Sequence, residues 1–473
     1  MRSQEVPGYA CRWLDRVPDL LGLWEGFPSQ FPYLLESAAR GPLGAHSLLL
    51  YAGDQVLRLH PDSNLSGPGR GKTFFERLES WYQQERLALG EGEPVSPARL
   101  PFCGGWFIYL GYEMAAEIEV TLELPPNRTG LPDAIAHRCH GAVIIIHDAE
   151  NPARDQAVAV AETESLLAEI VSCVEGPHAC GKSAAEQPVG KLETLTEEDS
   201  ERFEDSVARI HEYLLAGDVF QVNASRPWSG TFRTDAEPGV LYRSLRDHNP
   251  APFAGMMRWR DSVMLSSSPE RLVQVQGNRI QTRPIAGTRP RGSNEAHDRA
   301  LSKELIDNLK ERAEHIMLID LERNDLGRVC RPGTVDVNEL MVVESYAHVH
   351  HIVSNVCGEL NAQASPIDAI KAVFPGGTIT GCPKVRCMEI IAELEAEGRG
   401  SYTGSMGYLS RDGHMDLNIL IRSMLVQGRR FSFRTGAGIV ADSVPEQEVI
   451  ETRDKARGML LAIEPHRMEN RNA

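Results

Sequence analysis

The sequence predicts an α+β fold in which mainly antiparallel sheets are flanked by helices. Strand-like segments such as Ser405–Ser410 and Phe431–Arg434 occur in hairpin-like order. They do not alternate regularly with helices, which argues against a doubly wound parallel sheet. With 473 residues, the chain is long enough for a large buried core, as one big domain or as two to three smaller ones.

Residues 1–175 are the first of three predicted segments. Ser47–Tyr51 and Gly141–His147 are apolar and strand-like, and a helix is expected near Phe74–Leu89. A polar stretch that contains glycine and proline follows, so residues 176–196 are predicted to be a linker. The third segment, residues 197–466, has more regular periodicity.

Two helices are predicted early in the third segment. The first spans Glu197–Ala216 and ends at Gly217. The second spans Lys303–Leu321, and Glu314 lies at the edge of its apolar stripe, where a carboxylate needs a metal or a basic partner such as Lys310. The apolar positions are Phe203, Val207, Ile210, Leu214 and Leu215 in the first helix, and Ile306, Leu309, Ala313, Ile316 and Met317 in the second.

The C-terminal helix has a well-marked start, because Ser443–Glu446 matches a capping box with proline in the first turn. Glu448, Glu451 and Lys455 then fall along one helical face, with Thr452 beside them. Paired carboxylates that face a third one from another helix are suited to Mg²⁺. Glutamates near a helix N-terminus also simply stabilise the helix dipole.

The segment Gln281–Gly292 is predicted to be a strand that ends in a tight turn. Arg283, Arg289, Arg291 and Thr288 gather hydrogen-bond donors there, which suits an anionic small molecule. A basic turn is, taken alone, more often a solvated loop.

Two glycine-containing segments offer backbone amides to a ligand. Phe374–Lys384 contains three glycines and precedes a helix predicted over Val385–Leu394, an arrangement that suits a carboxylate. Arg434–Gly438 is the second such surface, and an ordinary loop explains either one equally well. On the strand-like segment Tyr346–Val356, alternation places His350 and His351 on opposite faces.

Composition excludes several classes of protein. The net charge is −17, from 49 Lys+Arg against 66 Asp+Glu, which argues against nucleic-acid binding. No apolar run is long enough to cross a membrane, and the N-terminus has no secretory pattern. The nine cysteines have no zinc-binding spacing and are expected to be reduced thiols, so a cytoplasmic location is predicted.

Seven ordered motifs, taken together, resemble those of the chorismate-utilising enzymes. The motifs are Ser268–Glu270, Arg283–Thr288, Glu311–Glu314, Asp320–Arg328, His351–Ser354, Gly377–Arg386 and Glu448–Thr452. The resemblance is dense over residues 200–465 and looser before residue 175. It implies a single large two-subdomain fold, in which residues 1–175 form an N-terminal region and residues 197–466 the chorismate-binding catalytic domain. It also implies chorismate and Mg²⁺ in a central cleft.

The resemblance implies a role for each matching residue. Glu314 and Glu451 correspond to metal carboxylates, with Glu448 adjacent and acting through water. Glu270 corresponds to the general acid for the C4 hydroxyl, and His351 to a positioning or proton-handling group. Binding roles follow for Tyr402 and Arg422 (enolpyruvyl carboxylate), for the amides of Gly436 and Gly438 (other carboxylate), and for the pocket positions Thr378 and Lys455.

Two catalytic positions narrow the branch of the family. Gln221 stands where water-adding members carry a lysine base, which points to an ammonia-adding enzyme. Ala286 stands, just before Thr288, where aminodeoxychorismate synthases often carry a nucleophilic lysine; anthranilate synthases have alanine there. Ala286, Tyr402 and the segment Ala313–His315 favour anthranilate synthase component I. Phe374–Thr380 and Asn249–Phe253 favour aminodeoxychorismate synthase component I.

We therefore expect aminodeoxychorismate synthase component I, with anthranilate synthase component I as the alternative. No glutaminase nucleophile motif is present, so a separate glutamine amidotransferase subunit is expected to supply ammonia. A tryptophan pocket is a further expectation, which rests on the family resemblance at Leu35, Ser37, Trp106, Pro252 and Phe253. It keeps open a non-enzymatic alternative, a regulatory protein that binds an aromatic amino acid.

Overall fold

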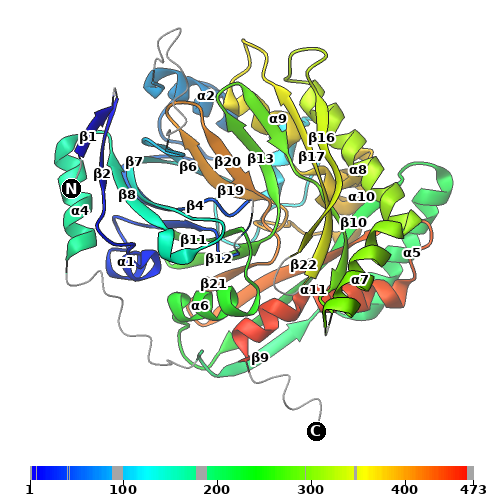
Figure 1. Cartoon of the computed structure of the whole chain (residues 1–473). Coiled ribbons are helices and arrows are strands. Elements are labelled where there is room, and N and C mark those ends of the chain that lie inside the picture. The colour runs from blue at the N-terminus through cyan, green and yellow to red at the C-terminus, as the bar shows by residue number, and fades with distance from the viewer. Residues whose placement is uncertain are drawn as a thin grey trace.

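The computed structural model describes residues 3–6, 8–39, 41, 43–87, 100–176, 189–292, 294–345 and 349–465, without the side chains of residues 3–6, 288, 290 and 349. The α+β class is confirmed: long antiparallel strands form the centre of the molecule and helices cover its outer faces (Figure 1). The strand pairs of the described residues are antiparallel and form one branched network, which divides into two sheets at β7 (Ala134–Ile146).

The first sheet runs from the edge strand to β7 through hydrogen-bonded neighbours. In spatial order these are β9 (Leu192–Glu197), β10 (Gln221–Phe232), β22 (Arg430–Ile439), β21 (Ser423–Gln427), β12 (Ser262–Ser268), β11 (Phe253–Trp259), β3 (Tyr33–Glu36) and β4 (His46–Leu59). Two short strands add to it, β5 (Leu65–Ser66) on β4 and β18 (Gly381–Cys382) on β10. The other half of β7 carries β8 (Gln156–Ala161), β2 (Tyr9–Trp13) and β1 (Ser3–Val6).

The second sheet leaves the first half of β7. Its order is β6 (Gly105–Leu110), β19 (Ser405–Ser410), β20 (Met415–Asn418), β13 (Arg271–Gln276), β14 (Arg279–Thr282) and β17 (Val349–Glu359), and both β15 (Ile285–Pro290) and β16 (Asp336–Ser345) pair with β17. Tyr33 of β3 stacks on Phe107 of β6, with ring centroids 3.7 Å apart, so the two sheets pack face to face.

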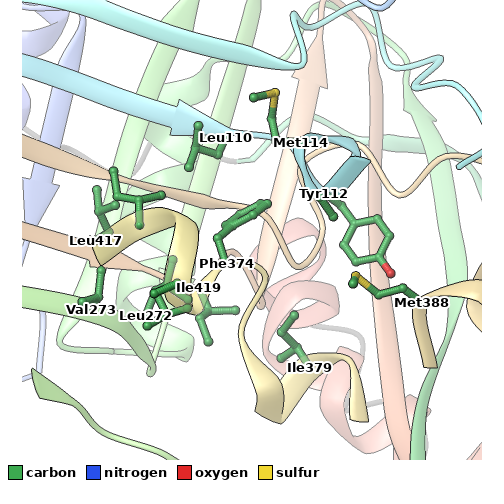
Figure 2. Packing of buried hydrophobic residues seen from close by; sticks show 14 of the residues in the cluster. Leu110, Tyr112, Met114, Leu272, Val273, Phe374, Ile379, Met388, Leu417 and Ile419 are labelled. Carbon is green, nitrogen blue, oxygen red and sulfur yellow. The ribbon is translucent and has the colours of Figure 1, made fainter. Parts of the chain in front are cut away.

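Helices bury the outer faces of both sheets. One core joins the first sheet to α1 (Leu20–Gly26), α4 (Glu164–Glu175), α6 (Pro238–His248) and α11 (Pro445–Ile463). Another joins the second sheet and the strands β10 and β22 of the first to α2 (Phe74–Glu85), α5 (Ser200–Ala216), α8 (Leu309–Gly327), α9 (Pro366–Val373) and α10 (Lys384–Glu395). Figure 2 shows Leu272, Phe374 and Ile379 in this second core. The remaining helices are α7 (Glu295–Asp307) and four short segments: α3 (Ala115–Ile118), η1 (Tyr112–Met114), η2 (Pro152–Arg154) and η4 (Gly377–Ile379).

The first predicted helix is confirmed with a later start. Asp199 caps α5 by accepting a hydrogen bond from the Glu201 amide, and Gly217 ends it with φ of +79°. Phe203, Val207 and Ile210 are buried as predicted, but Leu215 is 87% exposed. The apolar face is therefore narrower than the sequence pattern indicated.

The single helix predicted over Lys303–Leu321 is wrong. The segment forms α7 and α8, because Asn308 accepts hydrogen bonds from the amides of Lys310 and Glu311 and starts a new helix. The predicted apolar stripe is also wrong, since Leu309 is 79% exposed and Ile306 and Ile316 are exposed too. The buried face of α8 consists of His315, Leu318, Ile319, Glu322, Asp325 and Leu326, whose polar members hide the periodicity.

The capping box predicted at Ser443–Glu446 is wrong as well. Helix α11 begins at Pro445 after Val444, which makes no side-chain cap. The Ser443 hydroxyl instead accepts a hydrogen bond from the Val440 amide. Proline at the first helical position, as predicted, sets the start without a capping side chain.

The predicted segments are joined in the fold rather than separated. Strand β9 contains residues 192–196 of the predicted linker, of which residues 177–188 lie outside the described part. Strands before residue 175 pair with strands after residue 197 in both sheets, through β3–β11 and β6–β19. No helix among the described residues is long and apolar enough to span a membrane, and the eight described cysteines form no disulfide with one another.

Candidate functional site

The carboxyl group of Glu270 lies buried just before β13. The Thr378 hydroxyl, on η4, donates a 2.7 Å hydrogen bond to Glu270 Oε1. Burial raises the pKa of Glu270 to about 7, against the opposing effects of the Thr378 hydroxyl, the Ile285 amide and Lys455. A carboxyl of this kind is partly protonated near neutrality, so it can act as a general acid.

Strands β10 and β22 form the floor of the site. Asn223 pairs with Gly438 in this ladder. The side-chain amide of Asn223 donates a long hydrogen bond, 3.5 Å, to the Thr378 carbonyl. A Cβ on Gly438 would lie 2.4 Å from Gln221 Nε2, and one on Gly436 would lie 2.6 Å from the Tyr402 hydroxyl. Both glycines are therefore required by the side chains that lie over them.

Arg422 and His351 extend the site toward the second sheet. Burial lowers the pKa of Arg422, whose charge interacts with Tyr402, Glu451 and His351. Burial also lowers the pKa of His351 to about 4, so its ring is neutral near pH 7. One ring nitrogen of His351 lies 3.4 Å from the Gly287 carbonyl. His350 faces the other way and contacts Asp298, as the predicted alternation requires.

The segment Gln281–Gly292 forms two strands, β14 and β15, rather than one strand and a turn. Ala286 pairs with Ile352 and Thr288 with His351, and a bulge at Gly287, with φ of +65°, separates the two pairs. The side chain of Thr288 lies outside the described part. The bulge places this strand edge beside His351.

The three arginines of this segment, predicted to suit an anion, all form ion pairs within the protein. Each guanidinium is paired with carboxylates of the protein: Arg283 with Glu339 and Glu344, Arg289 with Glu304 and Glu311, and Arg291 with Asp298. Acidic residues elsewhere in the chain neutralise the basic segment. Only the fold brings these residues together.

The carboxylates predicted to bind metal come from α8 and α11. Burial raises the pKa of Glu314 and of Glu448, and the charge of Glu451 raises both further. Glu451 forms a 2.7 Å ion pair with Lys455, whose ammonium group also donates to the Gly436 carbonyl. Lys310 lies 4.0 Å from Glu314 and pairs more closely with Asp442, so the predicted Lys310–Glu314 contact is present but long.

These glutamates have the chemistry that a divalent cation requires. Glu448 Oε2 is buried without a hydrogen-bond partner among the described residues, and the charge of Glu451 repels those of Glu314 and Glu448. A shared cation would relieve this repulsion. Within the described residues, no three His, Cys, Asp or Glu side chains are close enough together to hold a metal. Glu451 would have to leave Lys455 to complete a set of three.

Two glycines of Phe374–Lys384, a segment predicted to offer backbone amides to a ligand, allow close packing within the protein. A Cβ on Gly377 would lie 2.4 Å from the Leu321 side chain, and one on Gly381 would lie 2.1 Å from the Gln221 carbonyl. These close approaches hold η4 against α8 and β18 against β10. Backbone crowding of this kind places Thr378 beside Glu270.

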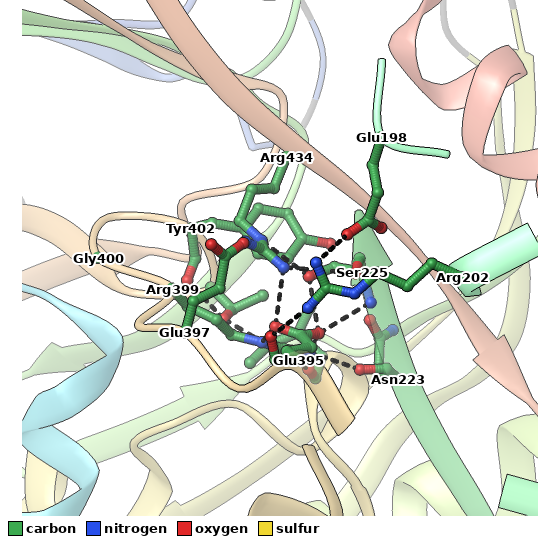
Figure 3. A network of polar contacts seen from close by, with 12 residues as sticks. Glu198, Arg202, Asn223, Ser225, Glu395, Glu397, Arg399, Gly400, Tyr402 and Arg434 are labelled. Carbon is green, nitrogen blue, oxygen red and sulfur yellow. Dashed lines mark hydrogen bonds and ion pairs between the residues drawn. The ribbon is translucent and has the colours of Figure 1, made fainter. Parts of the chain in front are cut away.

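A buried ion-pair network, which the sequence analysis missed, supports this site. Glu395 accepts hydrogen bonds from Arg399, Arg434 and Ser225 (Figure 3). Arg399 also donates to the Asn223 carbonyl, and its guanidinium lies 5.6 Å from the Tyr402 ring centre. The network thereby fixes two residues that border the site. The i,i+4 spacing of Glu395 and Arg399 was the one available signal.

Glu322 is a second buried carboxyl that the sequence analysis quoted in a motif but gave no role. Burial and the neighbouring Asp325 raise the pKa of Glu322 to about 8, and its charge interacts with that of Glu270. Asp325 is paired with Lys384 at 2.5 Å. Because Glu322 has no such close ion pair among the described residues, it is neutral near pH 7.

Four of the five predicted tryptophan-pocket residues line a separate cavity between the two sheets. This cavity has a volume of about 490 Å³, and Leu35, Ser37, Pro252 and Phe253 line it. Trp106 does not: its ring is fully buried against Trp81, Tyr82 and Arg138 in a neighbouring core. Sequence spacing does not show which face of β6 a tryptophan occupies, and the prediction for Trp106 is wrong.

Comparison with known proteins relates this architecture to a described family. Residues 51–461 match the chorismate binding enzyme family. The chain is 44% identical over 379 residues to an anthranilate synthase component I-like protein of Synechocystis, covering 78% of this chain and 74% of that protein. It is 42% identical over 373 residues to aminodeoxychorismate synthase component 1 of Bacillus subtilis, covering 77% of each.

A solved structure agrees with the sequence matches. Anthranilate synthase component I from Streptococcus pneumoniae superposes with a TM-score of 0.74 at 30% identity, covering 88% of this chain and 92% of that one. The buried acid, the paired β10–β22 floor and the carboxylates of α8 and α11 thus occur in a chain that belongs to the chorismate binding enzyme family.

Proposed function

We propose that the protein is an aminodeoxychorismate synthase component I, which converts chorismate and ammonia into 4-amino-4-deoxychorismate and water. The observation that carries the proposal is the arrangement of Glu270 and Gln221. A buried carboxyl with a pKa of about 7 can protonate a leaving hydroxyl, whereas an amide at position 221 cannot deprotonate water. The relative in Bacillus subtilis is named for this activity.

Different residues of the site bind the substrate and transfer the proton. Arg422 and Tyr402 bind the enolpyruvyl carboxylate, and the amides of Gly436 and Gly438 hold the second carboxylate. Thr378 orients Glu270 through its hydroxyl, and neutral His351 positions the ring without adding charge. Glu270 then gives its proton to the C4 hydroxyl as that group leaves.

Ala286 determines how the amine is introduced. Alanine has no nucleophile, so the reaction proceeds without a covalent bond between this position and the ring. We expect intact-mass spectrometry during turnover to show the unmodified mass only. A ring adduct on the protein would contradict the proposal.

Magnesium completes the proposed site. Glu314, Glu448 and Glu451 would hold the ion, which supplies Lewis-acid polarisation of the ring carboxylate when bound. We expect Glu448→Gln to weaken Mg²⁺ binding at least tenfold, because it removes one of the three carboxylates. Calorimetric titration with Mg²⁺ alone measures this independently of turnover. Glu446→Gln, an exposed neighbour in the first turn of α11, is the matched control and should bind Mg²⁺ as the parent does.

The ammonia is proposed to come from a glutamine amidotransferase subunit, because the relatives are named as component I proteins. Free ammonium should replace that subunit at high concentration. Incubation with chorismate, Mg²⁺ and ammonium chloride tests the activity directly. We expect 4-amino-4-deoxychorismate, which yields p-aminobenzoate only after a lyase is added.

Anthranilate synthase component I is the second candidate, favoured by Ala286 and by the solved relative from Streptococcus pneumoniae. In that case the same incubation would give fluorescent anthranilate and pyruvate without a lyase. The absence of any amine product would refute both candidates.

A further inference from the structure

Two buried amide oxygens in the proposed site have no hydrogen-bond donor. Gln221 and Asn223 are two residues apart on β10, so their side chains leave the same face of the strand. They are only 7% and 9% exposed. Gln221 Oε1 and Asn223 Oδ1 nevertheless accept no hydrogen bond within the described residues. A buried acceptor without a donor is destabilising, so the pair indicates a ligand that donates hydrogen bonds.

The two oxygens lie next to the substrate-binding residues. A Cβ on Gly436 would lie 2.9 Å from Asn223 Oδ1 and 2.6 Å from the Tyr402 hydroxyl oxygen, so both side chains approach this glycine. Figure 3 shows Asn223 and Tyr402 bordering one network. On its other side Asn223 faces Thr378, whose hydroxyl bonds Glu270. The acceptor pair and the acid are thus connected through a single residue.

The charges around the pair determine which donor fits. The Lys455 ammonium group donates to the Gly436 carbonyl. Arg399 and Arg434 both donate to Glu395 and neutralise its charge. Three further titratable groups near the pair are uncharged near neutrality, because burial raises the pKa of Tyr402 to about 12 and also raises the pKa of Cys382 and Cys387. Because two arginines already neutralise Glu395 and Lys455 adds a positive charge, these surroundings disfavour a cation. A small, neutral donor fits them best.

We propose that the side-chain oxygens of Gln221 and Asn223 bind ammonia and orient its lone pair toward the ring of chorismate. The inference rests on the proposed function and adds Asn223 as a residue that binds the nucleophile. The bond between nitrogen and C4 forms as the C4–oxygen bond breaks, and the hydroxyl leaves as water with the Glu270 proton. The new ammonium group returns one proton to the Glu270 carboxylate, so no oxidant or reductant is needed.

The same geometry discriminates against water as the nucleophile. A water molecule could donate to both oxygens, but water is a weak nucleophile unless a base removes its proton, and neither amide can accept one. Ammonia is a good nucleophile without a base. The amide pair therefore holds the one nucleophile that needs no base.

Steady-state kinetics with ammonium chloride, varied at fixed pH and saturating chorismate, test the proposal. We expect Asn223→Leu to raise the KM for ammonia about tenfold, because one acceptor is lost, and to leave the KM for chorismate within about twofold. Gln221→Met should behave in the same way. Thr231→Val, on the same strand but at its exposed end, is the matched control and should match the parent.

Asn223→Asp separates binding of ammonia from a structural role. The carboxylate keeps the acceptor but favours ammonium, the unreactive form, so the pH of maximal activity should rise by about one unit. Unchanged ammonia KM values in Asn223→Leu and Gln221→Met would overturn the proposal, as would a parallel rise in the KM for chorismate. If the parent protein itself forms no amine from chorismate and ammonium, the proposed function fails, and the inference fails with it.

Discussion

At the scale of single residues, the charge of Glu270 couples activity to stability. Its buried carboxyl has a pKa of about 7, against an ordinary value of 4.5. Between these values the native state binds more protons than the unfolded state, so stability falls as pH rises through this window. Above pH 7 the full cost of the buried charge is present.

Glu270→Gln is therefore expected to abolish most of the activity and to stabilise the protein at high pH. Removal of the buried charge should raise the free energy of unfolding by about 2–3 kcal/mol at pH 8 and leave it unchanged at pH 5. Urea denaturation at both pH values, together with a turnover assay, measures the two effects. Equal stability of parent and variant at pH 8 would show that the Glu270 carboxylate is not destabilising.

The pH dependence of the reaction should report the same group. At a fixed concentration of free ammonia, the rate should decline as pH rises through about 7, because the acid loses its proton. His351, with a pKa of about 4, should contribute no change between pH 6 and pH 8. Initial rates from pH 5.5 to pH 9, with total ammonium adjusted at each pH, provide the test; a rate that rises through neutrality would exclude Glu270 as the proton donor.

At the scale of secondary-structure elements, local capping determined what periodicity did not. The residues from 303 to 321 are all compatible with one helix, yet the side chain of Asn308 accepts two amides and starts α8 anew. In α8, Glu322 is buried and Glu314 is half-buried, while Leu309 and Ile316 are exposed. A sequence window scores the apolar residues and cannot know that carboxyls will be buried.

Asn308→Ala should destabilise the protein by about 1 kcal/mol, because two amides lose their acceptor. Asn361→Ala, which removes a single acceptor in an exposed turn, is the control and should cost much less. Chemical denaturation gives both values. A loss equal to that of the control would mean that the start of α8 does not depend on Asn308.

At the scale of the whole molecule, both sheets cross the boundary between the predicted segments. The β3–β11 and β6–β19 ladders link residues before 175 to residues after 197. Tyr33 and Phe107 then stack between the sheets. Neither segment can bury its own inner face without the other.

A fragment that begins at residue 189 is accordingly expected not to fold, since it would expose the edges of β11 and β19 together with the inter-sheet core. The full chain should unfold in one cooperative transition. Circular dichroism and thermal unfolding of both proteins provide the test. A fragment with native spectra and a sharp transition would show that the C-terminal segment folds independently.

Sequence and tertiary structure each account for a different part of this protein. Hairpin-like order predicted antiparallel sheets, and the ordered motifs predicted the family together with residues such as Glu270, Thr378 and His351, because these depend on local pattern and residue identity. The sequence did not show that Trp106 lies in the core, that three arginines are neutralised, or that Glu322 is buried. It also gave no sign that the oxygens of Gln221 and Asn223 lack donors. Those facts depend on which distant residues come within a few ångströms of each other, and burial and pairing of charges are decided only when both sheets and their helices pack together.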